Sequence, residues 1–433
     1  MQVNLPKYPD GWVTESLDAA AHINPESLGE ATPPMFRFRY IDISSVSHGE
    51  IDWATVTDQT FSTSPSRARR IVRPRDVLLC TVRPGLQSHT FANWSDADGY
   101  VCSTGFAVIH ATDRVEPRYL FHLIFSEAVS AQLRQLETGS NYPAVNESDV
   151  RSLRVPIAPL PEQRRIAEIL DTIDAAIQQT DTLIAKLKQR KAGLLHDLLT
   201  RGLDENGELR DPLAHPEQFK DSPLGRIPRE WGLVAVGEVF DMQLGKMLSK
   251  AARTGRNPYP YLANRNVLWE RVDLSDLEMM DFSEEEQAKF SLLPGDLLVC
   301  EGGEVGRTAI WHGEIEHCYF QKAIHRLRPK DSRVSPEYML RFMRRAVDCG
   351  FLTNLVSQTS IAHLTQEKLA LLPIALPLLE EQKMIVCIFD AHDSQIRTEE
   401  IYREKLKQMK QGLMEDLLTG RVSTDGKRIR FAG

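Results

Sequence analysis

The residues best suited to chemistry in this chain are two clusters of basic side chains. Between Arg67 and Arg83 the only acidic residue is Asp76, and between Lys246 and Arg265 there is none. Arginine donates two parallel hydrogen bonds from a planar group, which matches guanine edges and phosphates. A single arginine run is most often a solvated surface, but two such runs in separate parts of the chain favour nucleic-acid binding.

Motifs for catalysis are scarce. The sequence contains no Gly-x-x-x-x-Gly-Lys-Ser/Thr phosphate loop and no His-Glu-x-x-His. Gly302–Gly306 is glycine-rich, but its spacing does not fit a nucleotide-binding loop, so we expect a tight turn. Nearby histidine and cysteine side chains match no metal-site template. They are His312, His317, Cys318 and His325.

One short motif leaves a catalytic alternative open. Asn257-Pro-Tyr-Pro-Tyr261 is similar to the Asn-Pro-Pro-Tyr motif of amino-methyltransferases. Its second proline is displaced, however, and no glycine-rich cofactor loop precedes it. We expect an extended entry to a strand here, and we predict no catalytic residue and no metal ligand in the chain.

Length and composition indicate a multidomain globular protein. The 433 residues are 42% hydrophobic and 26% charged, enough for about two or three domains of about 150 residues. The net charge of −8 argues against a protein that coats nucleic acid without specificity, but permits a local basic site.

Cysteine usage and apolar runs predict a cytoplasmic protein. The six cysteines form no Cys-x-x-Cys pair. The longest apolar run, Leu369 to Leu379, is broken by Pro373 and Pro377 and is too short for a membrane helix. The first residues lack the apolar core of a signal peptide, so we expect no export and no membrane contact.

The two halves of the chain repeat each other at an offset of 219 residues. Glu162-Gln163 recurs as Glu381-Gln382, and Asp197–Thr200 recurs as Asp416–Thr419. Such a long period indicates a duplicated domain pair rather than a solenoid. The boundaries that we expect are a globular region at 1–158, a helix at 159–202, a linker at 203–220, a second globular region at 221–376, a second helix at 377–420 and a tail at 421–433.

Each repeat ends in a long stretch with heptad spacing. Apolar residues alternate in steps of three and four, which is the seam of a coiled coil. The first seam is Ile166, Leu170, Ile173, Ile177, Ile184, Leu187, Leu194 and Leu198. The second is Ile385, Phe389, Ile396, Leu406, Leu413 and Leu417.

The two helices are expected to pair with each other. Lys191 and Lys410 fill the same seam slot, which can fix the register of a pair. The second seam weakens at Glu399 and Arg403. Because the halves are related by a pseudo-twofold, we expect antiparallel pairing. The alternative is that each helix packs only on its own globular region.

Both globular regions show short strand-like runs followed by an amphipathic helix. The first has such runs at 36–43, 76–82 and 105–109, with the helix at 117–136. The second has them at 261–267, 296–300 and 323–327, with the helix at 336–355. The predicted fold class is therefore α+β: two pseudo-twofold-related mixed α/β domains joined by two long antiparallel coiled-coil helices.

With these motifs together, the sequence resembles the DNA-specificity subunit of type I restriction–modification systems. The resemblance covers essentially the whole chain. It rests on the segments 156–163 and 373–382 that lead into the helices, on the endings Gly193–Thr200 and Gly412–Thr419, and on the entry Asp221–Trp231.

The resemblance implies a non-catalytic chain with two target-recognition domains, each reading half of a split site in double-stranded DNA. It also implies two modification subunits that use S-adenosylmethionine to methylate adenine. Two restriction subunits, driven by ATP and Mg, are expected to join them. This chain itself is expected to hold no cofactor.

Arginine, lysine, asparagine and hydroxyl side chains are the candidates for DNA contact. In the first half they are Arg37, Arg39, Arg67, Arg69, Arg70, Arg83, Ser140 and Asn141. In the second half they are Lys246, Lys250, Arg253, Asn264, Arg265, Arg307, Thr359 and Ser360. The rival interpretations are a coiled-coil scaffold that displays two protein-binding domains, and a methyltransferase with a degenerate motif at Asn257.

Overall fold

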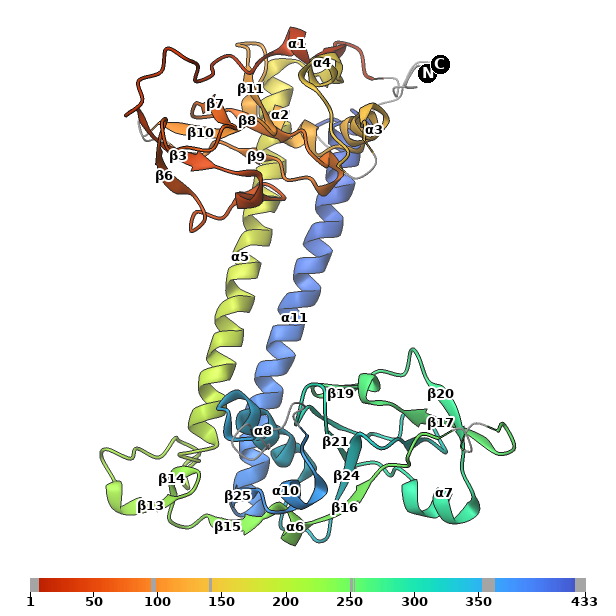
Figure 1. Cartoon of the computed structure of the whole chain (residues 1–433). Helices are drawn as coiled ribbons and strands as arrows, with labels where there is room; N and C mark the ends of the chain where they lie inside the picture. The colour runs from red at the N-terminus through yellow and green to blue at the C-terminus, as the bar shows by residue number, and fades with distance from the viewer. Residues whose placement is uncertain are drawn as a thin grey trace. The chain divides into compact units, whose positions relative to one another are not determined.

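The computed structural model describes residues 8–94, 99–139, 142–249, 252, 254–352 and 363–424. The chain divides into two compact units. Unit 1 comprises Met1–Thr182 and Glu400–Gly433, and unit 2 comprises Leu183–Glu399. Each unit therefore contains a globular part together with a segment of both long helices (Figure 1).

Two four-stranded sheets form the globular part of unit 1. Their strand orders are β6-β3-β10-β7 and β2-β11-β8-β9, beside the pairs β1-β12 and β4-β5. The strands are β1 (Val13–Ser16), β2 (Ala21–Ile23), β3 (Arg37–Ile41), β4 (Val46–Ser47), β5 (Glu50–Ile51), β6 (Thr57–Thr60), β7 (Ala68–Val72), β8 (Val77–Cys80), β9 (Thr90–Phe91), β10 (Tyr100–Ser103), β11 (Phe106–Ala111) and β12 (Arg154–Ile157).

Helices pack on the second of these sheets. The helices of this part are α1 (Leu17–Ala20), α2 (Pro117–Ile124), α3 (Glu127–Leu136) and α4 (Glu147–Ser152), with 3₁₀ turns η1 (Ile43–Ser45) and η2 (Pro84–Leu86). The sequence predicted one helix over 117–136, but the structure has two. The helix breaks because Ser126 takes an extended conformation and its hydroxyl caps α3 by accepting from the Val129 amide.

Unit 2 repeats this plan with three strands in place of four in one sheet. The sheet orders are β16-β24-β21-β22 and β20-β17-β23, beside the pairs β13-β14, β15-β25 and β18-β19. The strands are β13 (Phe219–Ser222), β14 (Gly225–Pro228), β15 (Gly232–Ala235), β16 (Phe240–Leu244), β17 (Pro258–Leu262), β18 (Val267–Leu268), β19 (Arg271–Val272), β20 (Glu278–Asp281), β21 (Leu297–Cys300), β22 (Thr308–Ile310), β23 (Tyr319–Phe320), β24 (Ile324–Pro329) and β25 (Pro373–Leu376).

The strand predicted at 261–267 is shifted in the structure. β17 ends at Leu262, because the Asn266 side chain accepts from the Ala263 amide and turns the chain into η5 (Asn264–Asn266). The other helical elements of unit 2 are η3 (Pro216–Gln218), α6 (Val236–Val239), α7 (Glu284–Phe290), α8 (Pro336–Asp348) and α10 (Gln366–Ala370).

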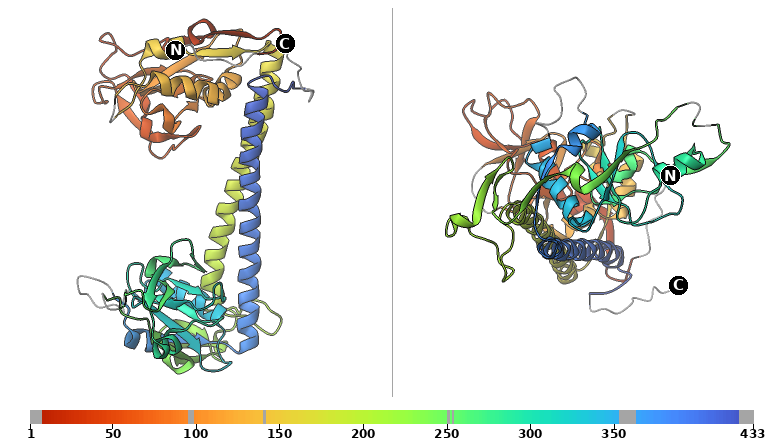
Figure 2. Two further views of the ribbon diagram at one scale, coloured as in Figure 1. Left: turned by 90° about the vertical axis from the view of Figure 1, so that its right-hand side faces the viewer. Right: turned by 90° about the horizontal axis from the view of Figure 1, so that it is seen from below.

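Two 39-residue helices, α5 (Leu160–Leu198) and α11 (Leu379–Leu417), run through both units. In unit 1, Asp174 pairs with Lys410 at 2.6 Å and Asp181 pairs with Arg403 at 3.0 Å. The residue numbers rise along one helix as they fall along the other, so the helices are antiparallel there. In Figure 2 they run side by side in this unit.

Unit 2 holds the other ends of the same helices. Lys191 pairs with Asp393 at 2.5 Å. Leu198 of α5 and Ile385 and Phe389 of α11 share one buried core, so the pairing is antiparallel here as well. No helix in the described part of the chain is long and apolar enough to span a membrane.

The predicted seam residues are mostly buried. Ile177, Leu194 and Leu413 are half-buried, and the remaining eleven are buried. Ile166 and Leu170 also belong to the core of unit 1's globular part. The helices therefore both pair with each other and pack on the globular parts, two arrangements that the sequence left as alternatives.

The repeated Glu-Gln pair attaches each globular part to its helix. In unit 1, Gln163 accepts from the Glu116 amide and donates to the Ala158 carbonyl. In unit 2, Gln382 accepts from the Ser335 amide and donates to the Pro377 carbonyl. The side chain thus ties the helix start to a loop of the domain, which explains why this motif recurs.

The preceding glutamate anchors a tryptophan in both units. Trp12 donates to Glu162 at 3.0 Å, and Trp231 donates to Glu381 at 3.0 Å. In unit 2 the carboxylate also accepts from the Leu203 amide and from Arg210. In the described chain Glu381 therefore accepts more hydrogen bonds than Glu162 does.

Candidate nucleic-acid interface

Two of the predicted arginines in unit 1 are neutralised within the chain. Arg67 forms an ion pair with Asp42 at 3.0 Å. Arg70 pairs with Glu147 at 3.3 Å and donates to the Ser27 hydroxyl. These carboxylates partly neutralise the positive charges with which the two arginines would bind a DNA phosphate.

Arg37, Arg39 and Arg69 have no carboxylate partner among the described residues. Arg37 is exposed at the start of β3. Arg69 donates to the Ala68 carbonyl, and its guanidinium lies 4.9 Å from the centre of the Phe61 ring. The positive charges of these three side chains are therefore available to an anionic or acceptor-rich ligand.

Arg39 is held by aromatic residues. Its Nη1 donates to the Tyr100 hydroxyl at 3.0 Å. The guanidinium lies 5.5 Å from the ring centres of both Trp53 and Tyr100. Trp53 is 43% exposed, whereas Tyr100 is buried. Arg39 was a candidate from the sequence, but the two aromatic residues could not be linked to it because they lie elsewhere along the chain.

Arg83 directly precedes the turn η2. Its backbone is left-handed, with φ of 47°, and its guanidinium lies 4.5 Å from the centre of the Tyr142 ring. Its amide donates to the Pro143 carbonyl at 2.7 Å, which joins this turn to the loop after α3. The predicted Ser140 and Asn141 of that loop lie outside the described residues.

In unit 2 the described candidates all have partners within the chain. Lys246 pairs with Glu286 at 2.6 Å, and Arg265 pairs with Glu278 at 2.8 Å. Arg307 donates to the backbone carbonyl of Asn264. The Asn264 side chain donates to the Gly302 carbonyl. Lys250, Arg253, Thr359 and Ser360 lie outside the described residues.

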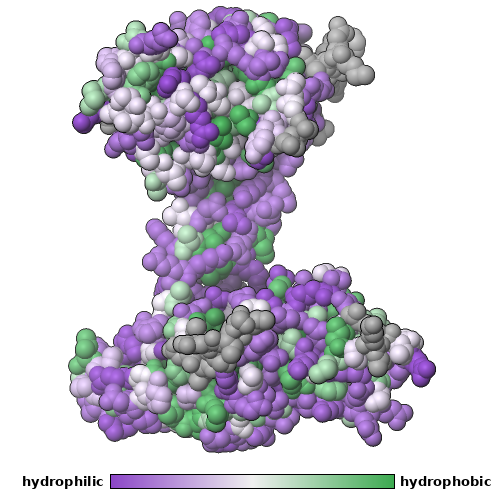
Figure 3. Space-filling model, viewed as in Figure 1, coloured by the Kyte–Doolittle hydropathy of each residue, from purple (hydrophilic) through white to green (hydrophobic). Residues whose placement is uncertain are grey.

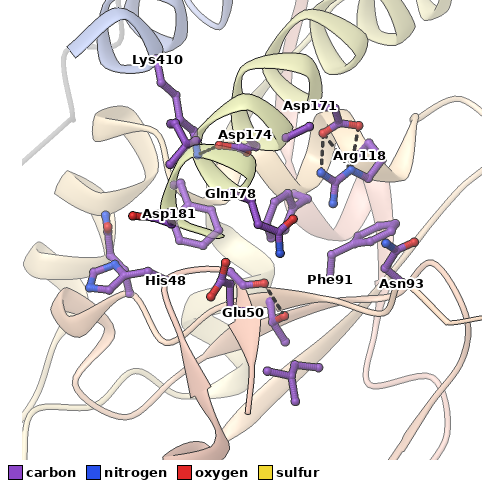
Figure 4. Close-up of a pocket in the computed structure, with 18 of the residues that line it drawn as sticks. His48, Glu50, Phe91, Asn93, Arg118, Asp171, Asp174, Gln178, Asp181 and Lys410 are labelled. Carbon is purple, nitrogen blue, oxygen red and sulfur yellow. Dashed lines mark hydrogen bonds and ion pairs between the residues drawn. The ribbon is translucent and has the colours of Figure 1, made fainter. Parts of the chain in front are cut away.

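A cleft of about 1080 Å³ lies in unit 1, between the globular part and the helix pair. Figure 4 shows Arg118 pointing toward Asp171 and Lys410 pointing toward Asp174. Burial alone would raise the pKa of Asp171, but hydrogen bonds from His122 and Arg118 lower that pKa to about 2. This carboxylate is therefore an ionised structural anchor, not a proton donor near neutral pH.

Neither suspected chemical motif gathers a reactive site. Asn257 precedes β17 and its side chain donates to the Phe282 carbonyl. Within the described ranges no three His, Cys, Asp or Glu side chains are grouped as metal ligands would be. Figure 3 shows hydrophilic residues over most of the visible surface of each unit, interrupted by separate apolar areas.

Comparison with known proteins gives one consistent answer. Residues 78–189 and 228–408 match the family model described as the type I restriction modification DNA specificity domain. The MjaVIII specificity subunit of Methanocaldococcus jannaschii is 24% identical over 343 residues, covering 77% of this chain and 76% of the relative. The EcoKI specificity subunit of Escherichia coli K12 is 24% identical over 46% of this chain and 41% of its own.

Solved structures agree over nearly the whole length. A chain from a structure describing complex assembly and conformational transition of the type I R-M system is 26% identical, with a TM-score of 0.64, and the match covers 96% of this chain and 100% of that one. The HsdS subunit from Thermoanaerobacter tengcongensis is also 26% identical, with a TM-score of 0.53, over 96% and 98% of the two chains.

These likenesses confirm three of the predictions made from the sequence: the family, the α+β fold class with its paired helices, and a specificity subunit that is not itself the enzyme. The chain belongs to the family of DNA specificity subunits of type I restriction–modification systems.

Proposed function

We propose that this chain reads a bipartite site in double-stranded DNA, with one half-site for each globular part. The observation that carries the proposal is the division of the family match into two stretches, one in each repeat. The two parts are built alike but differ in the side chains on their sheets, as expected if they read different bases. The domain boundaries of the proposal are those expected from the sequence, with reading domains at 1–158 and 221–376.

The proposed partners supply the chemistry. Two modification subunits would bind S-adenosylmethionine and methylate adenine, and two restriction subunits would use ATP and Mg. This chain would select the site and recruit them. Its family supports the division of labour, and a cytoplasmic location, where chromosomal DNA lies, goes with it.

The proposed contacts combine phosphate binding with base reading. Arg37, Arg39 and Arg69 in unit 1 are the strongest candidates, because none of them forms an ion pair with a described carboxylate. The paired residues Arg67, Arg70, Lys246 and Arg265 would have to exchange a carboxylate for DNA. Such an exchange reduces the net gain from each contact.

Methylation-site sequencing tests the proposal directly. A host that carries the chain with its modification subunit should show methylated adenines in one motif of two defined half-sites around an undefined spacer. The same host without the gene for this chain should lose that motif. Methylation that persists without the chain, or a motif with a single uninterrupted part, would contradict the proposal.

The paired helices are proposed to set the spacer. Deleting one heptad from each helix, 178–184 together with 397–403, removes about 10 Å of helix at 1.5 Å per residue. The repeat offset keeps the two deletions matched. The motif should then keep both half-sites and shorten its spacer, whereas an unchanged spacer would show that the helices do not measure it.

A further inference from the structure

Arg39 occupies a distinctive place in the sheet of unit 1. β3 lies between β6, to which it is antiparallel, and β10, to which it is parallel. Arg39 is in register with Tyr100 on β10 and with Asp58 on β6. Its guanidinium interacts with Tyr100 and forms no ion pair with a carboxylate of the described chain.

Aromatic packing fixes the orientation of this guanidinium. Tyr100 is 2% exposed, and its ring lies 4.4 Å from the ring of Trp94. Trp53 meets the same two rings edge-on, at 5.6 Å from Trp94 and 5.9 Å from Tyr100. Arg39 is thus held over a rigid aromatic platform, which reduces the entropy lost when it binds a ligand.

The hydrogen-bonding capacity of Arg39 is not used up. Of its five N–H groups the chain engages one, at the Tyr100 hydroxyl. The other four have no partner in the described chain. None of the nitrogens that carry them is both buried and without a partner, in contrast to Nε of Arg70 and of Arg307. Its free donors therefore reach solvent.

A structural arginine would be expected to have a carboxylate partner, as Arg67 and Arg70 do. Its hydrogen bond to a neutral hydroxyl leaves Arg39 without an ion-pair partner in the described chain. A held, planar and half-solvated donor pair fits two adjacent acceptors in one plane. In the DNA major groove, guanine offers this arrangement through O6 and N7.

We propose that Arg39 reads a guanine in the half-site recognised by unit 1, with Tyr100 and Trp53 as positioning residues. This rests on the proposed function, because it assumes that unit 1 contacts DNA. The chemical class of the ligand is a G·C base pair presented in the major groove. The strand in the corresponding place of unit 2, β17, carries Pro258 and Pro260 and contains no arginine.

The experiment compares methylation motifs made by the full chain with its modification subunit. The variants are Arg39→Gln, Arg39→Lys and Tyr100→Phe. The control is Arg134→Gln, which removes one exposed positive charge from α3, where Arg134 pairs only with Glu127 in the described chain. The readout is the methylated fraction at sites that differ from the wild-type motif by one base pair.

Arg39→Gln should lower discrimination at one G·C pair of one half-site by about tenfold or more, the scale of a bidentate arginine–guanine contact. Arg39→Lys should retain part of that discrimination, because lysine keeps the charge but lacks the planar fork. Tyr100→Phe should weaken discrimination at the same pair by a smaller factor. Arg134→Gln should leave the motif unchanged.

The second half-site is an internal control for folding and assembly. A variant that keeps it, and keeps the spacer, has folded and joined its partner. Unchanged discrimination in Arg39→Gln, or a uniform loss over all base pairs, would overturn the assignment of Arg39 and leave the proposed function intact. Wild-type methylation without a bipartite motif would instead reject the proposed function.

Discussion

The two units carry the same short hairpin and use it differently. In unit 1 the β4-β5 turn is His48-Gly49, and in unit 2 the β18-β19 turn is Trp269-Glu270. Both turns dock on the neighbouring sheet. The Gly49 carbonyl accepts from the Thr90 hydroxyl, and the Glu270 amide donates to the Thr308 carbonyl.

The difference lies in what the turn offers to the helix pair. Glu270 reaches Lys191 at 3.3 Å and Arg341 at 2.6 Å. Arg341 in turn pairs with Asp390 and Asp393 of α11. Gly49 has no side chain for such a bridge, and it lines the cleft of unit 1. Duplication therefore kept the attachment of each domain to its helix, while the contacts beside it diverged.

Replacing Glu381 should show the largest difference between the units. Glu381→Gln leaves Arg210, whose side chain is 10% exposed, without its nearest charged partner, at a cost of about 4 kcal/mol. The matched variant Glu162→Gln alters one hydrogen bond from Trp12 and should cost about 1 kcal/mol. Hydrogen exchange resolved by peptide should show faster opening in unit 2 for the first variant. Equal effects in both units would contradict the comparison.

Acid should destabilise the part of unit 1 on which the β4-β5 turn docks. His89 Nδ1 accepts from the Cys80 amide, whereas in unit 2 the Cys300 amide donates to the Arg307 backbone carbonyl. Burial, and after it the charge of His48, lower the pKa of His89 from 6.5 to about 4.

The sign of the effect follows from this lowered pKa. The unfolded chain takes up the proton first, so the contribution of neutral His89 is complete above about pH 6.5 and is lost as the pH falls toward 4. The loss is about 3 kcal/mol. Hydrogen exchange at pH 7, 5.5 and 4.5 should show it for peptides around β8 and β9, and His89→Gln should remove that dependence. A pH dependence that survives in the variant would assign it to another group.

Removing the carboxylate of Glu270 should have the smallest of the three effects. Glu270→Gln weakens its contacts with Lys191 and Arg341 and should destabilise unit 2 by about 2 kcal/mol. Gly49→Ala is the matched change in unit 1. The backbone φ of Gly49 is 95°, and an added Cβ would lie 3.3 Å from Phe121, so the variant should lose about 1 kcal/mol through strain. If Glu270→Gln leaves exchange in unit 2 unchanged, the bridge adds nothing to that unit.

Elements with a strong local pattern could be predicted from the sequence. The seams follow from heptad spacing, and a glycine with left-handed backbone, Gly202 with φ of 63°, follows the end of α5. The equivalent positions of Lys191 and Lys410 in the two seams could also be predicted from the sequence. Their partners Asp174 and Asp393 could not, because an acidic residue beside a seam usually faces solvent.

The basic clusters were harder to interpret. Arg70 meets Glu147 across 77 residues of chain, and no local spacing announces such a pair. Arg39 differs from Arg67 only in what the fold places around it, Tyr100 and Trp53 in one case and Asp42 in the other. Charge density therefore predicted the class of ligand, while tertiary contacts decide which of the charges form ion pairs within the chain.

The lysine–aspartate pairs have a consequence for the origin of the molecule. Lys410 lies 219 residues after Lys191 (410 − 191 = 219), and Asp393 lies 219 after Asp174 (393 − 174 = 219). Each helix therefore brings one cation and one anion at equivalent positions. Two copies of an ancestral half-length chain would already have matched each other as an antiparallel, twofold-symmetric pair, and gene fusion could join them without any new contact.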